Sequence, residues 1–276
     1  MPEAPEKQAA KPAAKFGDLW VRIASAVVMV VIAGIVFWKG GDYVAAFLVV
    51  VGGLMAWEFR RLILPDASNS DMGLWVMVAG TSGSVVAANL LGFWLAFPIV
   101  GLAAGILWQI KHKRPLWIAS GMLYLAIPLT ALLVIRDMED GMRLVLWLVA
   151  AVMASDIGGY FAGRIFGGPK LWPAISPKKT WSGTVGGWVL ALGVGFFYWV
   201  AWPPIGLLPA MLYSVLLAMA AQGGDLFESW LKRKAGMKDS SKLIPGHGGL
   251  LDRFDGLLAA TTLFMFLHLT GAMNLA

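Results

Sequence analysis

The chain is a succession of long apolar segments separated by short polar loops. Hydrophobic residues make up 59% of its 276 residues and charged residues only 14%, whereas soluble domains carry about 25% charged residues. A helix of about 20 mostly apolar residues is long enough to cross the hydrocarbon core of a bilayer. The sequence therefore predicts an all-α protein, a polytopic bundle of transmembrane helices.

We predict nine transmembrane helices in one membrane domain, residues 19–276, preceded by a disordered cytoplasmic tail, residues 1–18, that is rich in Ala, Pro, Lys and Glu. The second helix is expected to end at the charged group Glu58, Arg60 and Arg61. The predicted spans are Leu19–Trp38, Tyr43–Trp57, Met72–Leu91, Phe93–Ile110, Leu116–Ile135, Met142–Phe166, Thr184–Trp202, Gly206–Leu231 and Leu250–Ala272.

The lysines and arginines of the loops indicate how these helices are oriented. If the N-terminus is cytoplasmic, only three of the 22, Lys39, Arg136 and Arg143, lie on the outer side. Cytoplasmic loops are enriched in these residues, so we predict a cytoplasmic N-terminus, an outer C-terminus and a multi-pass protein of the inner (cytoplasmic) membrane. The net charge of +6 is explained in the same way, and no nucleic-acid partner is expected. Cysteine is absent, which excludes disulfides, thiolate nucleophiles and cysteine-built metal sites.

Charged residues gather in one stretch, Gln222–Gly256, around the loop between the last two spans. Asp225 and Glu228 lie three residues apart near the inner end of the eighth helix, and Asp252 and Asp255 are spaced in the same way at the start of the ninth. Two such helix ends facing each other would form a cage of oxygen ligands that suits Mg²⁺. A solvated loop would explain the lysines of this stretch, but it explains poorly why acids lie on both helix ends.

The same stretch contains the run Pro245-Gly246-His247-Gly248-Gly249, which leads directly into the ninth helix. Glycines at this place can expose backbone N–H groups near a helix N-terminus. Anions bind at such positions, so the run is a candidate phosphate-binding element.

A second segment lies at the inner end of the sixth helix. Asp156 and Tyr160 are four residues apart and share a helical face, while Gly159 and Gly163 permit close approach of another helix. A helix-packing motif closed by Arg164 would explain the glycines. An aspartate at this depth favours a functional site.

A third segment, Ser176–Gly183, follows the sixth helix. Its adjacent Lys178 and Lys179, next to the hydroxyls of Ser176 and Thr180, suit a polyphosphate ligand. Taken alone, the segment is also typical of an ordinary positively charged cytoplasmic loop.

Together the three segments indicate metal-dependent transfer between a nucleotide and a lipid at the cytoplasmic surface. The sequence has neither a G-x-x-x-x-G-K-[ST] loop nor a strand followed by G-x-G-x-x-G. The alternative from another class is an ion-coupled transporter, whose acids usually lie near the middle of the membrane on broken helices.

The C-terminal half of the chain resembles the phosphatidate cytidylyltransferases. Asp156–Arg164 resembles that family's Asp-x-Gly-Ala-Tyr-x-x-Gly-Arg element, with Gly159 in place of the usual Ala. Ser176–Gly183 resembles its Ser-Pro-Lys-Lys-Thr-x-Glu-Gly element, with Ser182 in place of the usual Glu. The longest match comprises Ser229-Trp230-Leu231-Lys232-Arg233, Lys238-Asp239-Ser240-Ser241, Pro245-Gly246-His247-Gly248-Gly249 and Asp252-Arg253-Phe254-Asp255.

The resemblance implies that CTP and phosphatidic acid give CDP-diacylglycerol and pyrophosphate, in a homodimer within the lipid membrane. It implies that Asp225 and Asp252 hold Mg²⁺, with K⁺ as a candidate second cation, and that Glu228 and Asp255 are further metal ligands. The implied catalytic set also contains Lys178, Lys179, Arg253 and His247. The implied substrate-binding residues are Ser176, Thr180, Asp156, Tyr160, Arg164, Lys238, Asp239, Gly248 and Gly249. A CTP-dependent lipid kinase is the nearest alternative activity.

Overall fold

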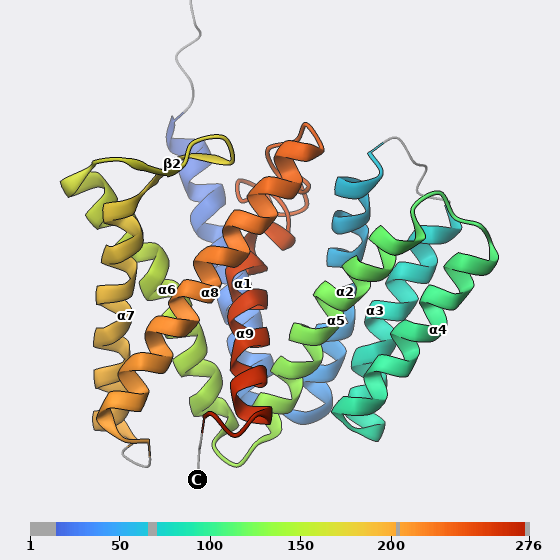
Figure 1. Cartoon of the computed structure of the whole chain (residues 1–276), viewed down its shortest axis with the longest axis horizontal. Helices are drawn as coiled ribbons and strands as arrows, with labels where there is room; N and C mark the ends of the chain where they lie inside the picture. Colours follow the sequence, from blue (N-terminus) through green and yellow to red (C-terminus); the bar gives the residue numbers. More distant parts are fainter. Residues whose placement is uncertain (1–14, 66–70, 203–204, 274–276) are drawn as a thin grey trace, which may run out of the picture.

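The computed structural model of the protein describes residues 15–65, 71–202 and 205–273 (Figure 1). Within these residues the chain forms nine α-helices, one short 3-10 helix and a two-stranded antiparallel hairpin. The helices are α1 (Lys15–Lys39), α2 (Gly41–Ile63), α3 (Met72–Leu91), α4 (Ala96–Gln109), α5 (Pro115–Asp137), α6 (Gly141–Phe166), α7 (Trp181–Ala201), α8 (Leu207–Lys234) and α9 (Leu251–Leu269). The other elements are η1 (Phe93–Leu95), β1 (Lys170–Trp172) and β2 (Ser176–Thr180).

Most of these helices are suited to a membrane. Seven of those described, α1, α2, α3, α5, α6, α7 and α8, are long and apolar enough to cross one. Helix α4 has only 14 residues, and α9 has 19 residues with three charges near its start; neither is among the seven. An all-α polytopic membrane protein is thus confirmed, with the addition of one short hairpin, while the number of spans stays a prediction.

The first helix begins earlier than predicted. Helix α1 starts at Lys15, so the last four residues of the expected tail, 15–18, are helical. The remainder of that tail, residues 1–14, lies outside the described part of the chain.

The second helix ends later than predicted. Helix α2 continues to Ile63, and Glu58 and Arg60 lie inside it with only 0% and 1% of their surface exposed. Charges can be buried where they are paired and hydrogen-bonded. Glu58 accepts hydrogen bonds from the start of α9, and Arg60 forms an ion pair with Asp71 at 2.7 Å. The end predicted at Trp57 is therefore wrong, because the charges that suggested it have partners inside the protein.

Asp71 ties this end of α2 to its neighbours. Besides Arg60, His112 in the turn after α4 contacts the same carboxylate oxygen at 3.1 Å. Partial burial tends to raise the pKa of Asp71, but the hydrogen bonds from Arg60 and His112 outweigh it and hold the pKa below its usual value. The carboxylate therefore stays ionised and fixes the last turn of α2.

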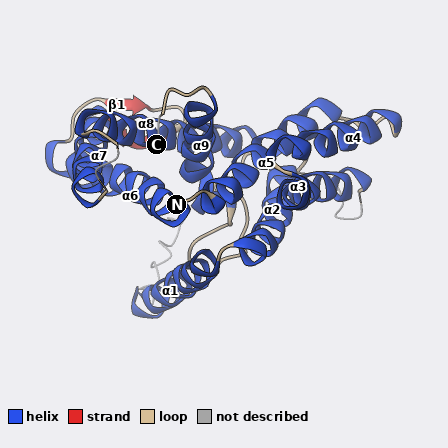
Figure 2. Cartoon of the chain, turned by 90° about the horizontal axis from the view of Figure 1, so that it is seen from below, coloured by secondary structure: helices blue, strands red, loops and turns tan. Residues whose placement is uncertain are grey.

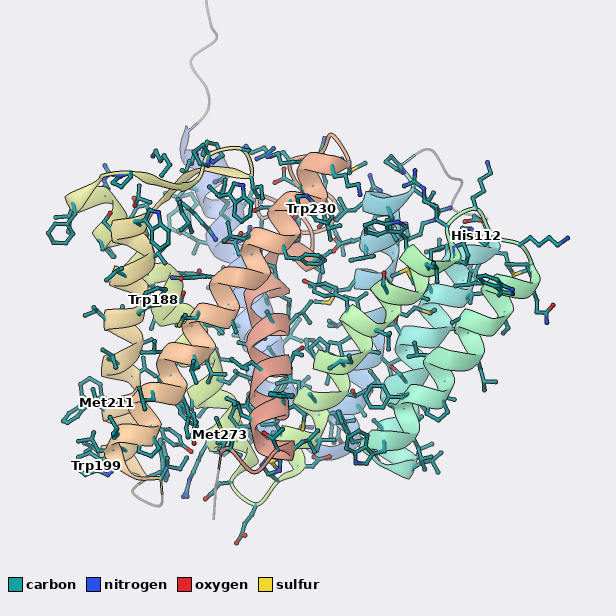
Figure 3. All side chains as sticks on the ribbon, viewed as in Figure 1. His112, Trp188, Trp199, Met211, Trp230 and Met273 are labelled. Atoms are coloured by element: carbon teal, nitrogen blue, oxygen red, sulfur yellow. The ribbon has the colours of Figure 1, made fainter. Side chains whose placement is uncertain are left out.

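The helices are arranged so that the charged loops meet at one end of the bundle. Helices α6 to α9 pack against one another, and α9 also packs on α5, whereas α1 packs mainly on α2 and stands apart (Figure 2). The start of α1, the hairpin and the loop between α8 and α9 lie at one end, which we call the hairpin end (Figure 1). Figure 3 shows Trp230 and His112 at this end, and Trp199 and Met273 at the opposite one.

Glycines bring α6 and α7 unusually close together. A Cβ added to Gly158 would lie 2.5 Å from the carbonyl oxygen of Gly186, and one added to Gly186 would lie 2.2 Å from Cβ of Ala162. Small residues permit such backbone contact between membrane helices. The hairpin connects these two helices, so their spacing positions it.

We expect Gly186→Ala to lower the free energy of unfolding by about 1–3 kcal/mol, because the new methyl group overpacks the contact with α6. Gly193→Ala on the same helix is the matched control: nothing lies within 4 Å of its added Cβ, and Ala favours a helix over Gly by about 1 kcal/mol. Thermal unfolding in detergent micelles measures both. Equal unfolding temperatures for the two variants would contradict the close packing.

Candidate active site

A cavity of about 420 Å³ lies between α6, the hairpin, α7 and α8. It contains most of the catalytic and substrate-binding residues predicted from the second and third sequence segments. Those that line it are Asp156, Tyr160, Arg164, Lys178, Lys179 and Thr180. Ser176, at the start of β2, is not part of the lining. Two separate sequence segments therefore form one cavity with charged side chains in its lining, at the hairpin end.

The hairpin places the lysines of this cavity. Strands β1 and β2 pair in antiparallel fashion, with Lys170 opposite Thr180. The hydroxyl of Thr180 then caps α7 by accepting a hydrogen bond from the N–H of Gly183 at 3.2 Å. Lys179, one residue before this cap, reaches α8 and forms an ion pair with Asp225. Lys179 on β2 therefore links the cavity to Asp225, the first of the predicted metal ligands in chain order.

Gln222 closes the cavity on the side of α8. Its Oε1 accepts a hydrogen bond from Nε1 of Trp188 at 3.0 Å, and its Nε2 donates to the carbonyl oxygen of Thr184 at 3.2 Å. Trp188 projects from α7 (Figure 3). A side chain that satisfies two partly buried polar groups of α7 fixes the distance between these helices.

Ser182, where the resembling family has Glu, does not face this cavity. Its hydroxyl donates to the carbonyl oxygen of Gly167 and contacts Oγ1 of Thr180 at 3.0 Å. The side chain at position 182 therefore closes the base of the hairpin. The cavity has its charged lining without a carboxylate at this position.

The predicted metal ligands on α8 differ in their surroundings. Asp225 is one-third exposed, pairs with Lys179 and accepts a hydrogen bond from Ser229 at 3.2 Å. Glu228 is completely buried: its Oε2 contacts Nζ of Lys232 at 3.0 Å, while its Oε1 has no hydrogen-bond partner. A buried oxygen without an N–H or hydroxyl donor is costly, and the neighbour of Glu228 on α9 is the carboxyl group of Asp255.

Asp255, on α9, completes a group of three acids with Asp225 and Glu228. It interacts electrostatically with both of them, and its Oδ1 accepts a hydrogen bond from the N–H of Gly256 at 2.7 Å. Lys179 and Lys232 balance the charge of these acids in the structure. No three His, Asp or Glu side chains of the described residues converge closely enough to enclose an ion.

Asp252 is engaged in a different way from the other acids. It is only 4% exposed, and Nζ of Lys232 contacts its Oδ1 at 2.7 Å. Its Oδ2 accepts hydrogen bonds from the N–H and the hydroxyl of Ser240, at 2.9 and 3.0 Å, and from the N–H of Gly249 at 2.8 Å. Asp252 therefore holds the loop between α8 and α9 against the start of α9.

The predicted anion site at this helix start is filled by the protein itself. The N–H of Gly249 is bound by Asp252, and the next two, of Leu250 and Leu251, are bound by Glu58. Gly248 has φ of 84° and pairs with Ile244 in a tight turn. The glycines thus serve the loop's own fold, rather than an exposed phosphate cradle.

The remaining predicted residues lie around this loop. Nδ1 of His247 contacts the hydroxyl of Ser25 on α1 at 2.9 Å, so His247 joins α1 to the loop. Lys238 and Asp239 are exposed. Arg253 is exposed on α9 and interacts electrostatically with Asp156 in the cavity.

Glu58, whose carboxylate reaches the α8–α9 loop from α2, is not among the site residues predicted from the sequence. The available signal was an acid directly after a predicted span, at a depth where charges are usually functional. The residue was interpreted as the end of that span instead.

Comparison with known proteins gives a consistent match over most of the chain. The model of the cytidylyltransferase family matches residues 20–270. A phosphatidate cytidylyltransferase of Brucella suis biovar 1 is 38% identical over 262 residues, which cover 93% of this chain and 94% of that protein. A protein of the same name from a Helicobacter pylori strain is 36% identical, over 90% of this chain and 91% of its own length. Another, from Pseudomonas aeruginosa, is 33% identical, over 88% of this chain and 94% of its own length.

The two predicted principal metal ligands should differ in their effect on stability. We expect Asp252→Asn to cost on the order of 3 kcal/mol of folding free energy, because it removes a buried anion from Lys232 and two backbone amides. Asp225→Asn loses a partly exposed ion pair and should cost about 1 kcal/mol or less. Thermal unfolding of both variants in detergent micelles makes the comparison. An equal loss of stability would show that the Asp252 network does not hold the loop.

Proposed function

Because the chain belongs to the cytidylyltransferase family, we propose that it is a phosphatidate cytidylyltransferase, which makes CDP-diacylglycerol for phospholipid synthesis. A phosphate oxygen of phosphatidic acid forms a bond to the α-phosphorus of CTP. The bond from that phosphorus to the bridging oxygen breaks, and pyrophosphate leaves. The lipid phosphate is already anionic at neutral pH, so the reaction needs little help from a general base.

The observation that carries this proposal is the cationic cavity beside a group of acids. Lys178, Lys179 and Arg164 line one cavity, and their charges suit the triphosphate of CTP. Nη1 of Arg164 donates to the Tyr160 hydroxyl at 2.9 Å, which holds the guanidinium at the rim. Lys179 already contacts Asp225, so the phosphate-binding and acidic parts of the site adjoin.

We propose Mg²⁺ as the cofactor, with K⁺ as a candidate second cation. Asp225, Glu228 and Asp255 would hold it after their side chains move closer together, since in the described residues no three acids enclose an ion. Carboxylate oxygens are the ligands that Mg²⁺ prefers, and the buried Oε1 of Glu228 accepts no hydrogen bond from an N–H or hydroxyl group. Asp252 would join them through Oδ1, whose shortest contact is with Lys232. When bound, the metal neutralises phosphate charge and polarises the phosphoryl oxygens. Lys179 can then turn from Asp225 to the substrate phosphates.

The decisive experiment supplies α-labelled CTP, phosphatidic acid and Mg²⁺ to the protein in detergent micelles. Label should enter the organic phase only with phosphatidic acid present, and a chelator should stop it. A CTP-dependent lipid kinase would instead transfer label from the γ-position. Failure to label lipid from the α-position with well-folded protein would reject the proposed reaction.

We expect Asp225→Asn to lower kcat on the order of 10²-fold or more, because a proposed metal ligand beside the cytidylyl group that is transferred is lost. Asp140→Asn is the matched control, since Asp140 is an exposed acid paired with Arg143 in the turn before α6. Initial rates of lipid labelling give both values. A near-normal rate in the folded Asp225 variant would remove the acid group from the mechanism.

We also propose that the protein lies in the inner membrane with its hairpin end on the cytoplasmic side. All nine helices would cross the membrane and form one domain. The lysine and arginine distribution supports this orientation, and the start of α1 lies at the hairpin end (Figure 1). The homodimer implied by the family resemblance stays a prediction.

A tag placed after Ala276 should therefore react with impermeant reagents only from the outer side of the membrane. Intact cells or spheroplasts, compared with inverted vesicles, provide the measurement. Labelling only in inverted vesicles would mean that the number of crossings is even.

A further inference from the structure

Glu58 is a buried acid that none of the sequence segments contains. It lies on α2, is fully inaccessible to solvent and accepts three hydrogen bonds. The donors are the Ser241 hydroxyl at 2.5 Å, the N–H of Leu250 at 2.9 Å and the N–H of Leu251 at 2.6 Å. These partners lie more than 180 residues further along the chain. A carboxylate with three donors at a helix N-terminus is well stabilised even when buried.

Glu58 and Asp252 bind neighbouring groups of the same two segments. In the loop, Asp252 accepts a hydrogen bond from the hydroxyl of Ser240, and Glu58 accepts one from the hydroxyl of Ser241. At the start of α9, Asp252 accepts a hydrogen bond from the N–H of Gly249, and Glu58 accepts hydrogen bonds from the N–H groups of Leu250 and Leu251. The two carboxylates therefore clamp the loop to the helix start from two sides.

Gly249 shows how tightly this clamp is closed. A Cβ added there would lie 1.9 Å from Oγ of Ser240 and 2.4 Å from Oε1 of Glu58. Real Cβ atoms do not approach other atoms so closely, and the loop is held at a defined distance from α2. The end of α2 is itself fixed by the ion pair between Arg60 and Asp71.

We propose that Glu58 is a positioning residue that sets the first turn of α9, and with it Asp252 and Asp255, against the acids of α8. The inference rests on the proposed cytidylyltransferase reaction, in which those acids would hold the metal beside the α-phosphorus of CTP. Asp252 and Asp255 lie in the first turns of α9, directly after the amides that Glu58 binds. A small shift of the helix start would move both carboxylates together.

Glu58→Gln tests the proposal with almost no change of volume. The amide has one acceptor oxygen and a donor group, so it cannot accept from both Leu250 and Leu251 as the carboxylate does. We expect kcat to fall about 10- to 100-fold, the KM for CTP to stay within about twofold, and the Mg²⁺ concentration for half-maximal rate to rise. Hydrogen exchange at the amides of residues 249–252 should become faster.

Glu139→Gln is the control, because it makes the same charge change at an exposed glutamate in the turn between α5 and α6. All of its values should match the parent protein. An unchanged kcat and Mg²⁺ dependence in Glu58→Gln would overturn the proposal. So would a loss of activity that is fully accounted for by the unfolded fraction.

If Glu58→Gln does not fold, Ser241→Ala removes only one of the three donors. It should lower kcat about two- to fivefold, in the direction expected for Glu58→Gln, with a smaller rise in amide exchange. A parental kcat and exchange rate in this variant would count against the clamp. Should the parent protein fail to label lipid at all, the proposed reaction fails, while the exchange data still decide whether Glu58 holds α9.

Discussion

The need to compensate the negative charge of buried carboxylates determines how the elements at the hairpin end of this bundle are arranged. An ionised acid in a low-dielectric interior is unfavourable unless cations or N–H groups surround it. Lys232 contacts both Glu228 and Asp252, and Lys179 contacts Asp225. Glu58 accepts hydrogen bonds from two backbone N–H groups at the start of α9. Apart from the Lys232–Glu228 pair, which lies within α8, each contact joins two elements, so the interactions that compensate the charges also set the relative positions of α2, α8, α9 and the hairpin.

Local sequence patterns were sufficient for much of the fold. Long apolar segments are recognised by length and composition alone, and the resemblance of the C-terminal half identified the family that the whole-chain comparison shows. The grouping of Asp156, Arg164, Lys178 and Lys179 in one cavity also followed from their expected place at one membrane face. These inferences depend on residues that are near one another in sequence or share a membrane boundary.

Contacts between segments that are distant in the sequence could not be predicted from local sequence patterns. Whether Glu58 ends a helix or lies inside one depends on donors from Ser241, Leu250 and Leu251, which no local pattern contains. For the same reason, the glycines before α9 were interpreted as an open anion site, although Asp252 and Glu58 occupy those amides. Spacing shows which groups are available, but their partners are determined by the packed structure.

The link from α2 to α9 also means that the C-terminal half is not a structurally self-contained unit, although it carries every motif by which it resembles the family. Position 58 and the loop around Ser241 and Gly249 form one sterically matched contact. A chimera that joins the first five helices of one relative to the last four of another would divide that contact between two parents. To stay intact, the exchanged block must include α2 together with the α8–α9 loop, which makes the natural unit of recombination discontinuous in sequence.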